Sequence, residues 1–193
     1  YLGGTFGGTI GVSGSSIDIH NCTLVNNRQA PVLGGAVYSH SQSPVRMWST
    51  IAYFNWRTNG AVANYGGNTG TGGFSMTNCC VYPAFAGANN FTNDPRFVDA
   101  AGQDYHLAGD SPCVDTGTNQ AWMAEALDLD GRPRIDPLAG VVDRGCYENA
   151  AGGERGMSMS SAGALLQGLD PLSDLDGDGI CNADEIRTGT DPC

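Results

Sequence analysis

Three segments in the first half of the chain share one alternation of apolar and polar residues. They cover residues 17–25, 45–53 and 74–82, and their equivalent positions are 28 and 29 residues apart. Apolar residues at the first and third positions of each segment alternate with polar ones, which is the period-2 pattern of a half-buried strand. The sequence therefore predicts one strand-and-turn unit that occurs three times.

A second register repeats alongside the first. Residues 8–12, 35–38 and 60–63 combine glycine with small or β-branched residues and recur at intervals of 27 and 25. Short strands joined by Gly or Asn turns in a repeat of this length are typical of a parallel β-solenoid, whose coils stack at about 4.8 Å. An antiparallel sandwich would also alternate, but the joint recurrence of both registers favours the solenoid.

Several motifs add a resemblance to a known family. Coil starts of the form Gly-Gly-x-hydrophobic and the strand end Asn21-Cys22-Thr23 resemble bacterial secreted right-handed parallel β-helix proteins. Residues 93–148 resemble the closing region of such proteins, through five motifs in order: residues 93–99, 104–107, 111–117, 128–134 and 142–148. The resemblance covers about three quarters of the chain. It implies the fold and export from the cell, and it does not imply one activity.

The expected fold class is therefore all-β: a right-handed parallel β-helix with an irregular C-terminal cap and a small calcium-binding loop module. The expected parts are coils at 1–92, a closing region at 93–148, a linker at 149–168 and the calcium loop at 169–193. A last coil exposes unpaired backbone and core, so it needs a cap. Eight apolar residues are expected to cover that open end: Phe91, Phe97, Val98, Leu107, Val114, Trp122, Ile135 and Val141.

Charge divides the chain of 193 residues into two unequal halves. Residues 1–93 hold Asp18 and three Arg, a net charge of +2, whereas residues 94–193 hold 19 acids and six Arg, a net charge of −13. There is no lysine, and the formal charge is −11. This balance argues against nucleic-acid binding and against a basic membrane-surface protein. No apolar run approaches 18 residues, so membrane insertion is not expected.

The seven cysteines favour an oxidising compartment. Two disulfides are expected, Cys113–Cys146 in the closing region and Cys181–Cys193 at the chain end. Cys22, Cys79 and Cys80 remain as core thiols or as partners of another segment or subunit, since Cys22 and Cys79 lie two coils apart and beyond disulfide reach. No Cys-x-x-Cys occurs, so no zinc knuckle or thioredoxin-type site is indicated.

The strongest chemical motif lies near the end of the chain. Residues 174–185 fit the calcium-loop pattern D-x-D-x-D-G-x5-E at every position. Ca²⁺ takes six to eight oxygen ligands, and this spacing wraps them around one ion. The predicted ligands are three carboxylates, a backbone carbonyl, an amide (direct or through water) and a bidentate glutamate: Asp174, Asp176, Asp178, Ile180, Asn182 and Glu185.

The flanks of this loop extend the match to a family unit. Leu169-Asp170-Pro171 and residues 187–192 make the segment similar to a bacterial thrombospondin type 3-like or dockerin-like calcium unit. A dockerin usually has two such loops, and one is present, which argues against cohesin binding. Structural calcium is the expected role.

Catalysis is not expected. Many parallel β-helices are polysaccharide lyases or glycosidases, and a glycosidase needs two carboxylates that flank the scissile bond. The coils offer only Asp18, and His20 and His40 lack an apparent partner. A pair from the closing region, Asp94 with Asp99, stays as the alternative.

The sequence thus predicts an extracellular or cell-surface structural protein of bacterial type, calcium-stabilised and self-assembling into a filament or surface layer. An uncapped first coil around Tyr1, Leu2, Phe6 and Ile10 would pair with another copy. The alternative is an adhesin or carbohydrate-binding module that holds a surface glycan. Its candidate stacking platforms are Tyr38, Trp48, Tyr53 and Trp56. A start at Tyr1 without Met fits a mature product or a fragment.

Overall fold

The structure is a computed structural model that describes residues 9–29, 35–41, 43–67, 73–135, 137 and 139–149. The chain divides into two compact units, Tyr1–Glu148 and Asn149–Cys193, and the fold described below is that of the first. The all-β expectation is confirmed, because the one helical element among the described residues is the short 3-10 helix η1 (Ala121–Glu125).

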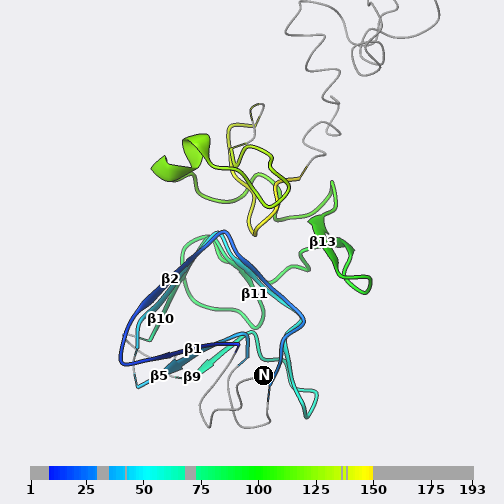
Figure 1. Cartoon of the computed structure of the whole chain (residues 1–193). Helices are drawn as coiled ribbons and strands as arrows, with labels where there is room; N and C mark the ends of the chain where they lie inside the picture. Colours follow the sequence, from blue (N-terminus) through cyan, green and yellow to red (C-terminus); the bar gives the residue numbers. More distant parts are fainter. Residues whose placement is uncertain are drawn as a thin grey trace, which may run out of the picture. The chain divides into compact units, whose positions relative to one another are not determined.

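Short parallel strands build the first part of this unit (Figure 1). They are β1 (Ile10–Ser13), β2 (Ile17–His20), β3 (Thr23–Leu24), β4 (Arg28–Gln29), β5 (Val37–His40), β6 (Val45–Trp48), β7 (Ile51–Ala52), β8 (Trp56–Arg57), β9 (Tyr65–Gly67), β10 (Phe74–Thr77) and β11 (Cys80–Val81). Strands that follow one another along the chain belong to different sheets. The three-stranded sheets have the orders β1-β5-β9, β2-β6-β10 and β3-β7-β11, and β4 pairs with β8.

The first predicted register is confirmed. Ile17 pairs with Val45, and Val45 pairs with Phe74, at the intervals of 28 and 29 read from the sequence. The next sheet follows the same spacing, since Thr23 pairs with Ile51.

The second register is confirmed for its first step and wrong for its second. Ile10 pairs with Val37 as expected, but Val37 pairs with Tyr65 and not with Val62. Residues 57–61 form a tight turn, closed by the Arg57 amide that donates to the Ala61 carbonyl at 2.8 Å. This turn brings Val62 back against Trp56 as an antiparallel bridge, so the third strand of the sheet starts later in the sequence.

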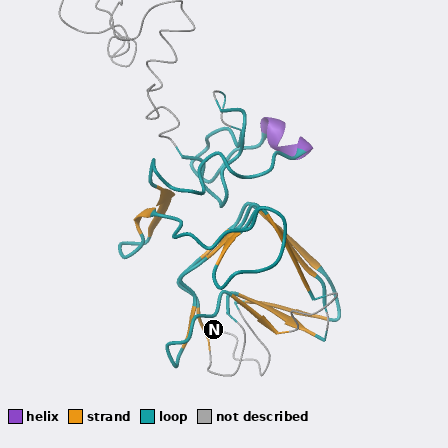
Figure 2. Ribbon diagram, turned by 180° about the vertical axis from the view of Figure 1, so that it is seen from behind, coloured by secondary structure: helices purple, strands orange, loops and turns teal. Residues whose placement is uncertain are grey.

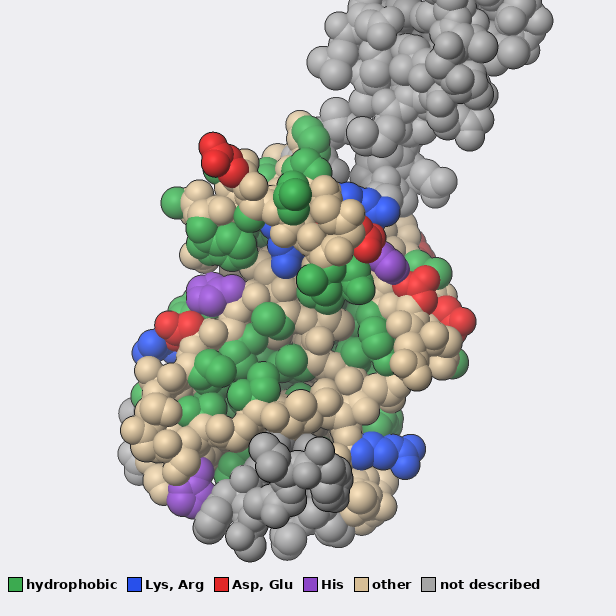
Figure 3. All heavy atoms as spheres, viewed as in Figure 1, with side chains coloured by type: hydrophobic (Ala, Val, Ile, Leu, Met, Phe, Trp, Pro, Cys, Tyr) green, Lys and Arg blue, Asp and Glu red, His purple; other side chains and the backbone are tan. Residues whose placement is uncertain are grey.

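The three sheets face one another (Figure 2), and their inward side chains form one apolar cluster, which we call the apolar interior. Its buried members come from all three: Val12, Ile19, Ala36, Val37, Val45, Met47, Ala52, Met76, Cys79 and Val81. The alternation read from the sequence decides which side chains these are, because successive side chains of a strand point to opposite faces. On the outside, the face in Figure 3 shows hydrophobic and uncharged side chains over the coil strands, with charged ones mainly at its rim.

The corner between the second and third strand of each repeat has a left-handed backbone. Asn21, Ser49 and Asn78 occupy it with φ of 45°, 46° and 52°. Asparagine tolerates this region better than most residues, since its short polar side chain bonds locally. The three residues therefore form a stack of equivalent sharp bends, which we call the corner stack.

A second set of asparagines satisfies the backbone inside the next turn. Asn55 is fully buried; its Nδ2 donates to the carbonyls of Leu24 (2.7 Å) and Tyr53 (2.9 Å) and to Asn64 Oδ1 (2.7 Å). Its Oδ1 accepts the Asn27 amide at 2.9 Å. The Asn55 side chain thus links three successive repeats.

Residues 84–92 cover the outer edge of β10 and β11. Phe91 forms a parallel bridge with Cys80, and Phe85 packs against the apolar interior. Asn90 accepts the Cys79 amide at 2.9 Å and donates to the Met76 carbonyl at 3.0 Å. This segment therefore closes that edge.

The closing segment, residues 93–148, follows with the antiparallel hairpin β12 (Phe97–Asp99) and β13 (Asp104–Leu107), and then η1. Phe97, Leu107 and Val114 pack in a second apolar cluster, with Ile51 and Cys80. Two of the eight apolar residues expected to cover the open end do not: Val98 is 59% exposed and Trp122 is 50% exposed.

Candidate functional site

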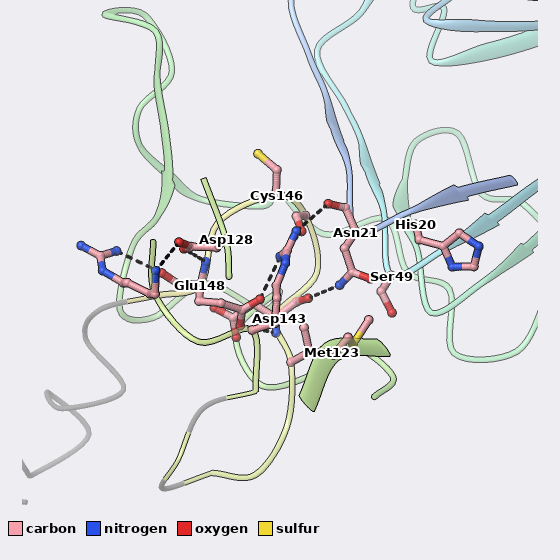
Figure 4. Close-up of polar contacts among 12 residues, drawn as sticks. His20, Asn21, Ser49, Met123, Asp128, Asp143, Cys146 and Glu148 are labelled. Carbon is pink, nitrogen blue, oxygen red and sulfur yellow. Dashed lines mark hydrogen bonds and ion pairs between the residues drawn. The ribbon is translucent and has the colours of Figure 1, made fainter. Parts of the chain in front are cut away.

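The closing segment packs against the corner stack, along the side of the parallel strands (Figure 4). The sequence alone predicts a position only over the open end. Asn21 Nδ2 donates to the Asp143 carbonyl at 3.1 Å, and the Gly145 amide donates to the Ser49 carbonyl at 2.8 Å. Asn78 Nδ2 donates to Thr118 Oγ1. Each level of the corner stack thus contributes at least one polar contact to the same segment.

A buried ion pair lies at this junction. Arg134 Nη1 lies 2.9 Å from Glu148 Oε1, and the two residues are 7% and 5% exposed. Arg134 also donates to the carbonyls of Gly145 (3.1 Å) and Asn21 (3.3 Å). Glu148 Oε2 accepts the Asp143 amide at 2.8 Å. The guanidinium therefore joins the first coil to the end of the closing segment.

Asp128 organises the loop beside this pair. Its Oδ1 accepts the amides of Asp130 and Arg132 at 2.8 Å, and its Oδ2 accepts the Glu148 amide at 2.8 Å. Burial raises the pKa of Glu148 to about 7, although Arg134 and the Asp143 amide favour the carboxylate. The Glu148 carboxyl therefore titrates near neutral pH.

A second titrating cluster is exposed at the hairpin. His106 Nδ1 contacts Asp104, its Nε2 lies 2.8 Å from Asp130 Oδ2, and its ring lies 4.1 Å from that of Tyr147. The hydrogen bond with Asp104, together with Asp130, raises the pKa of His106 above its usual value. The His106 ring thus ties β13 to the loop that Asp128 organises.

The groups considered for catalysis have structural contacts. Asp18 pairs with Arg46 on the neighbouring strand. His20 stacks on Trp48, with ring centroids 4.6 Å apart. In the closing segment, Asp94 accepts the Arg96 amide and Asp99 accepts the Gly102 amide, both as turn contacts. That the protein has no catalytic activity stays a prediction.

The four aromatic platforms named from the sequence differ in their surroundings. Tyr53 donates to the Thr92 carbonyl at 2.9 Å, Trp48 stacks on His20, and Tyr38 is half-buried. Trp56 lines a cavity of about 250 Å³, whose lining residues are Val25, Asn26, Phe54, Trp56, Ala100, Ala101 and Tyr105. The cavity joins the coils to the tip of the hairpin.

The five cysteines among the described residues are free thiols: Cys22, Cys79, Cys80, Cys113 and Cys146. The expected Cys113–Cys146 bond is therefore wrong for this structure. Cys113 lies in the same buried apolar cluster as Cys80, whose thiol donates to the Asn93 carbonyl at 3.3 Å, whereas the Cys146 amide donates to Thr23 Oγ1 at 3.1 Å. No sequence pattern indicated this arrangement, because Cys80 and Cys113 belong to different predicted parts. The expected Cys181–Cys193 bond lies outside the described residues.

The predicted calcium ligands Asp174, Asp176, Asp178, Ile180, Asn182 and Glu185 also lie outside the described residues. Within the described part of the chain, no group of three or more His, Cys, Asp or Glu side chains is arranged to hold a metal. In the same part, no helix has the length and apolar character needed to cross a membrane.

Comparison with known proteins identifies one module. Residues 174–193 match the bacterial TSP3 repeat, a calcium-binding module typical of extracellular proteins. All six predicted ligands lie within the matched segment. No curated protein and no solved structure matches the chain. The match supports the predicted calcium unit as a TSP3 repeat. No comparison supports the resemblance of the preceding residues to β-helix proteins.

Replacing Arg134 with Ala should lower the free energy of unfolding by about 3 kcal/mol or more, because it leaves the buried Glu148 carboxyl and two carbonyls without their donor. Urea unfolding followed by fluorescence measures the change. Arg96→Ala is the matched control, since Arg96 and its partner Asp110 have side chains 56% and 71% exposed. It should cost less than about 1 kcal/mol. Equal losses in both variants would contradict a structural role for the buried pair.

Stability should fall as the pH rises from 5 to 8. Between the ordinary carboxyl pKa of 4.5 and the folded value of about 7, the unfolded chain loses the Glu148 proton while the folded chain keeps it. This difference amounts to about 3 kcal/mol across the window. The raised pKa of His106 acts in the same direction, since its contribution is lost as the pH passes its folded value.

Urea midpoints measured at several pH values at constant calcium test this dependence. Glu148→Gln should flatten the curve between pH 4.5 and 7, whereas Glu125→Gln, at an exposed position, should leave it unchanged. A wild-type curve that rises through this window would show that the Glu148 assignment is wrong.

Proposed function

We propose that this protein is a calcium-stabilised structural subunit of an extracellular assembly, and that residues 10–81 form three coils of a right-handed parallel β-helix. The observation that carries the proposal is the register: three sheets pair in parallel, with one strand of each sheet in every 27–29 residues. Connections between parallel strands of one sheet are right-handed in nearly all proteins, which supports the handedness.

The first coil offers an edge for association. β1, β2 and β3 are the outer strands of their sheets. The inward side chains of Ile10, Ile17 and Leu24 on these strands are half-buried. Their counterparts one repeat later, Val37, Val45 and Ala52, are fully buried. A further layer of strands would complete the burial of these side chains and satisfy the outward backbone groups.

A second copy of this chain is the proposed partner. Residues 84–92 occupy the opposite edge, so the contact uses the β1–β3 edge of one copy and a different surface of its neighbour. The acidic second half, at −13, attracts the first half, at +2, within the screening length of about 8 Å at physiological salt. The calcium loop contributes by folding the tail that carries part of this charge.

Carbohydrate binding is the second candidate, favoured by the cavity beside Trp56. The ring of Trp56 and that of Tyr105 can stack on a sugar, and the amide of Asn26 is a polar group at the same place. Oligosaccharide binding that Trp56→Ala abolishes and Trp122→Ala preserves would favour this function over assembly.

Calcium binding is the first measurable consequence. Titration calorimetry of the full chain should show one Ca²⁺ binding event, which Asp176→Ala removes, because the loop loses one of its carboxylates. Asp170→Ala is the matched control, since Asp170 precedes the twelve-residue loop, and it should bind as the wild type does. Equal binding by Asp176→Ala and the wild type would show that the loop assignment is wrong.

Assembly is the second measurable consequence of the proposal. Sedimentation in calcium should show species larger than the 20.0 kDa chain, and chelation should shift them toward the monomer before the coils unfold. Ser13→Pro should reduce association at least tenfold, because the alternation along β1 points the Ser13 amide to the open edge. Ser15→Pro, in the following bend, should not. A monodisperse monomer at high concentration in calcium would overturn the proposal.

A further inference from the structure

Two buried thiols from distant parts of the sequence meet beside the coils. Cys80 belongs to β11 and Cys113 to the closing segment, and both are 0% exposed. Both residues belong to the buried apolar cluster that includes Ile51 and Leu107. The Cys80 thiol donates to the Asn93 carbonyl at 3.3 Å, and Cys113 is the neighbour with the largest effect on the pKa of Cys80. The contact therefore spans the interface between the coils and the closing segment.

The backbone holds each thiol in its place. The Cys80 amide donates to the Thr50 carbonyl at 3.0 Å, as part of the parallel sheet. The Cys113 amide donates to Ser111 Oγ at 3.1 Å, and the Cys113 carbonyl accepts the Arg144 amide at 3.0 Å. Since both backbones are anchored, the fold itself places the two side chains in one buried cluster.

We propose that Cys80 and Cys113 form a disulfide that fastens the closing segment to the third repeat when the chain folds under oxidising conditions. A low-molecular-weight disulfide such as oxidised glutathione is the oxidant. Thiolate exchange forms a mixed disulfide on one cysteine, and attack by the other forms the protein S–S bond. In total, two protein thiols lose two electrons and two protons, and one glutathione disulfide becomes two glutathione thiols.

Burial decides when the bond forms. Hydrogen bonding to Cys113 and burial raise the pKa of Cys80, so the folded chain holds little of the reactive thiolate. Exchange therefore takes place before the closing segment packs, and the finished bond is then shielded from reductants. The loop that it closes has 34 residues, for which loop-closure entropy gives an increase of about 500-fold in the folding equilibrium constant.

The neighbouring cysteines supply controls. Cys79 precedes Cys80 directly, but its side chain lies in the apolar interior between the sheets and donates to the Thr77 carbonyl. Cys22 packs against that same interior, whereas Cys146 contacts Thr23. Cys79→Ser therefore changes the adjacent thiol and leaves the proposed pair intact.

The experiment is refolding of the full chain in a glutathione redox buffer, alkylation of the remaining thiols, and tryptic mapping by mass spectrometry. The chain has no lysine, so trypsin cuts after arginine and releases residues 58–96 with Cys79 and Cys80, residues 97–134 with Cys113, and residues 145–155 with Cys146. We expect peptides 58–96 and 97–134 to be linked in the wild type and in Cys79→Ser. The link should be absent in Cys80→Ser and in Cys113→Ser.

A stability measurement on the wild type alone completes the test. Reduction of the oxidised protein in denaturant, followed by refolding with reductant present, should lower Tm by about 10 °C. Cys113 linked to Cys146, or alkylated Cys80 and Cys113 in wild-type protein refolded under oxidising conditions, would overturn the proposal.

Discussion

The left-handed corner stack of Asn21, Ser49 and Asn78 is the constraint on which the rest of the described unit depends. A bend of one residue lets two short strands of neighbouring sheets follow each other without a loop, so the repeat stays at 28 or 29 residues. The same bend exposes backbone and side-chain polar atoms on the outside of the corner. Because these atoms need partners, a segment that supplies them can pack there, and the closing segment does so at all three levels.

The sequence predicted strands and their register correctly where the alternation of inward and outward side chains recurs in every repeat. Alternation of Ile17 and Ile19, and of Val45 and Met47, identified strands and their register, since the period of a strand is two. It was misleading at residues 60–63, where a glycine-closed turn resembled the start of a strand. Gly60 has φ of +83°, which fits a turn. The glycine pattern of residues 60–63 alone does not show which strand the following residues pair with.

The contacts of the closing segment could not be read in this way. The bond of Arg134 to the Asn21 carbonyl spans 113 residues, and that of the Cys146 amide to Thr23 spans 123. No periodicity connects such residues, and charge alone does not distinguish Arg134, which is buried and paired, from Arg96, which is exposed. The predicted pairing of Cys113 was wrong for the same reason, because the cysteine that shares its buried cluster, Cys80, lies in another part of the sequence.

Polar groups are satisfied by a different means in each part of the chain, and this difference explains the uneven charge. The parallel-strand part buries neutral amides such as Asn55, which can donate to and accept from neighbouring strands without a desolvated charge. The closing segment has no such repeat, so it depends on a few ionised groups, and the pKa of Glu148 near 7 shows how much burial opposes them. The TSP3 repeat has five acids within twelve residues, a density that neither amides nor the two arginines of the second unit can neutralise locally. In the proposed function a divalent ion supplies the missing positive charge there, and this is the physical reason to expect that calcium is needed for folding of that module.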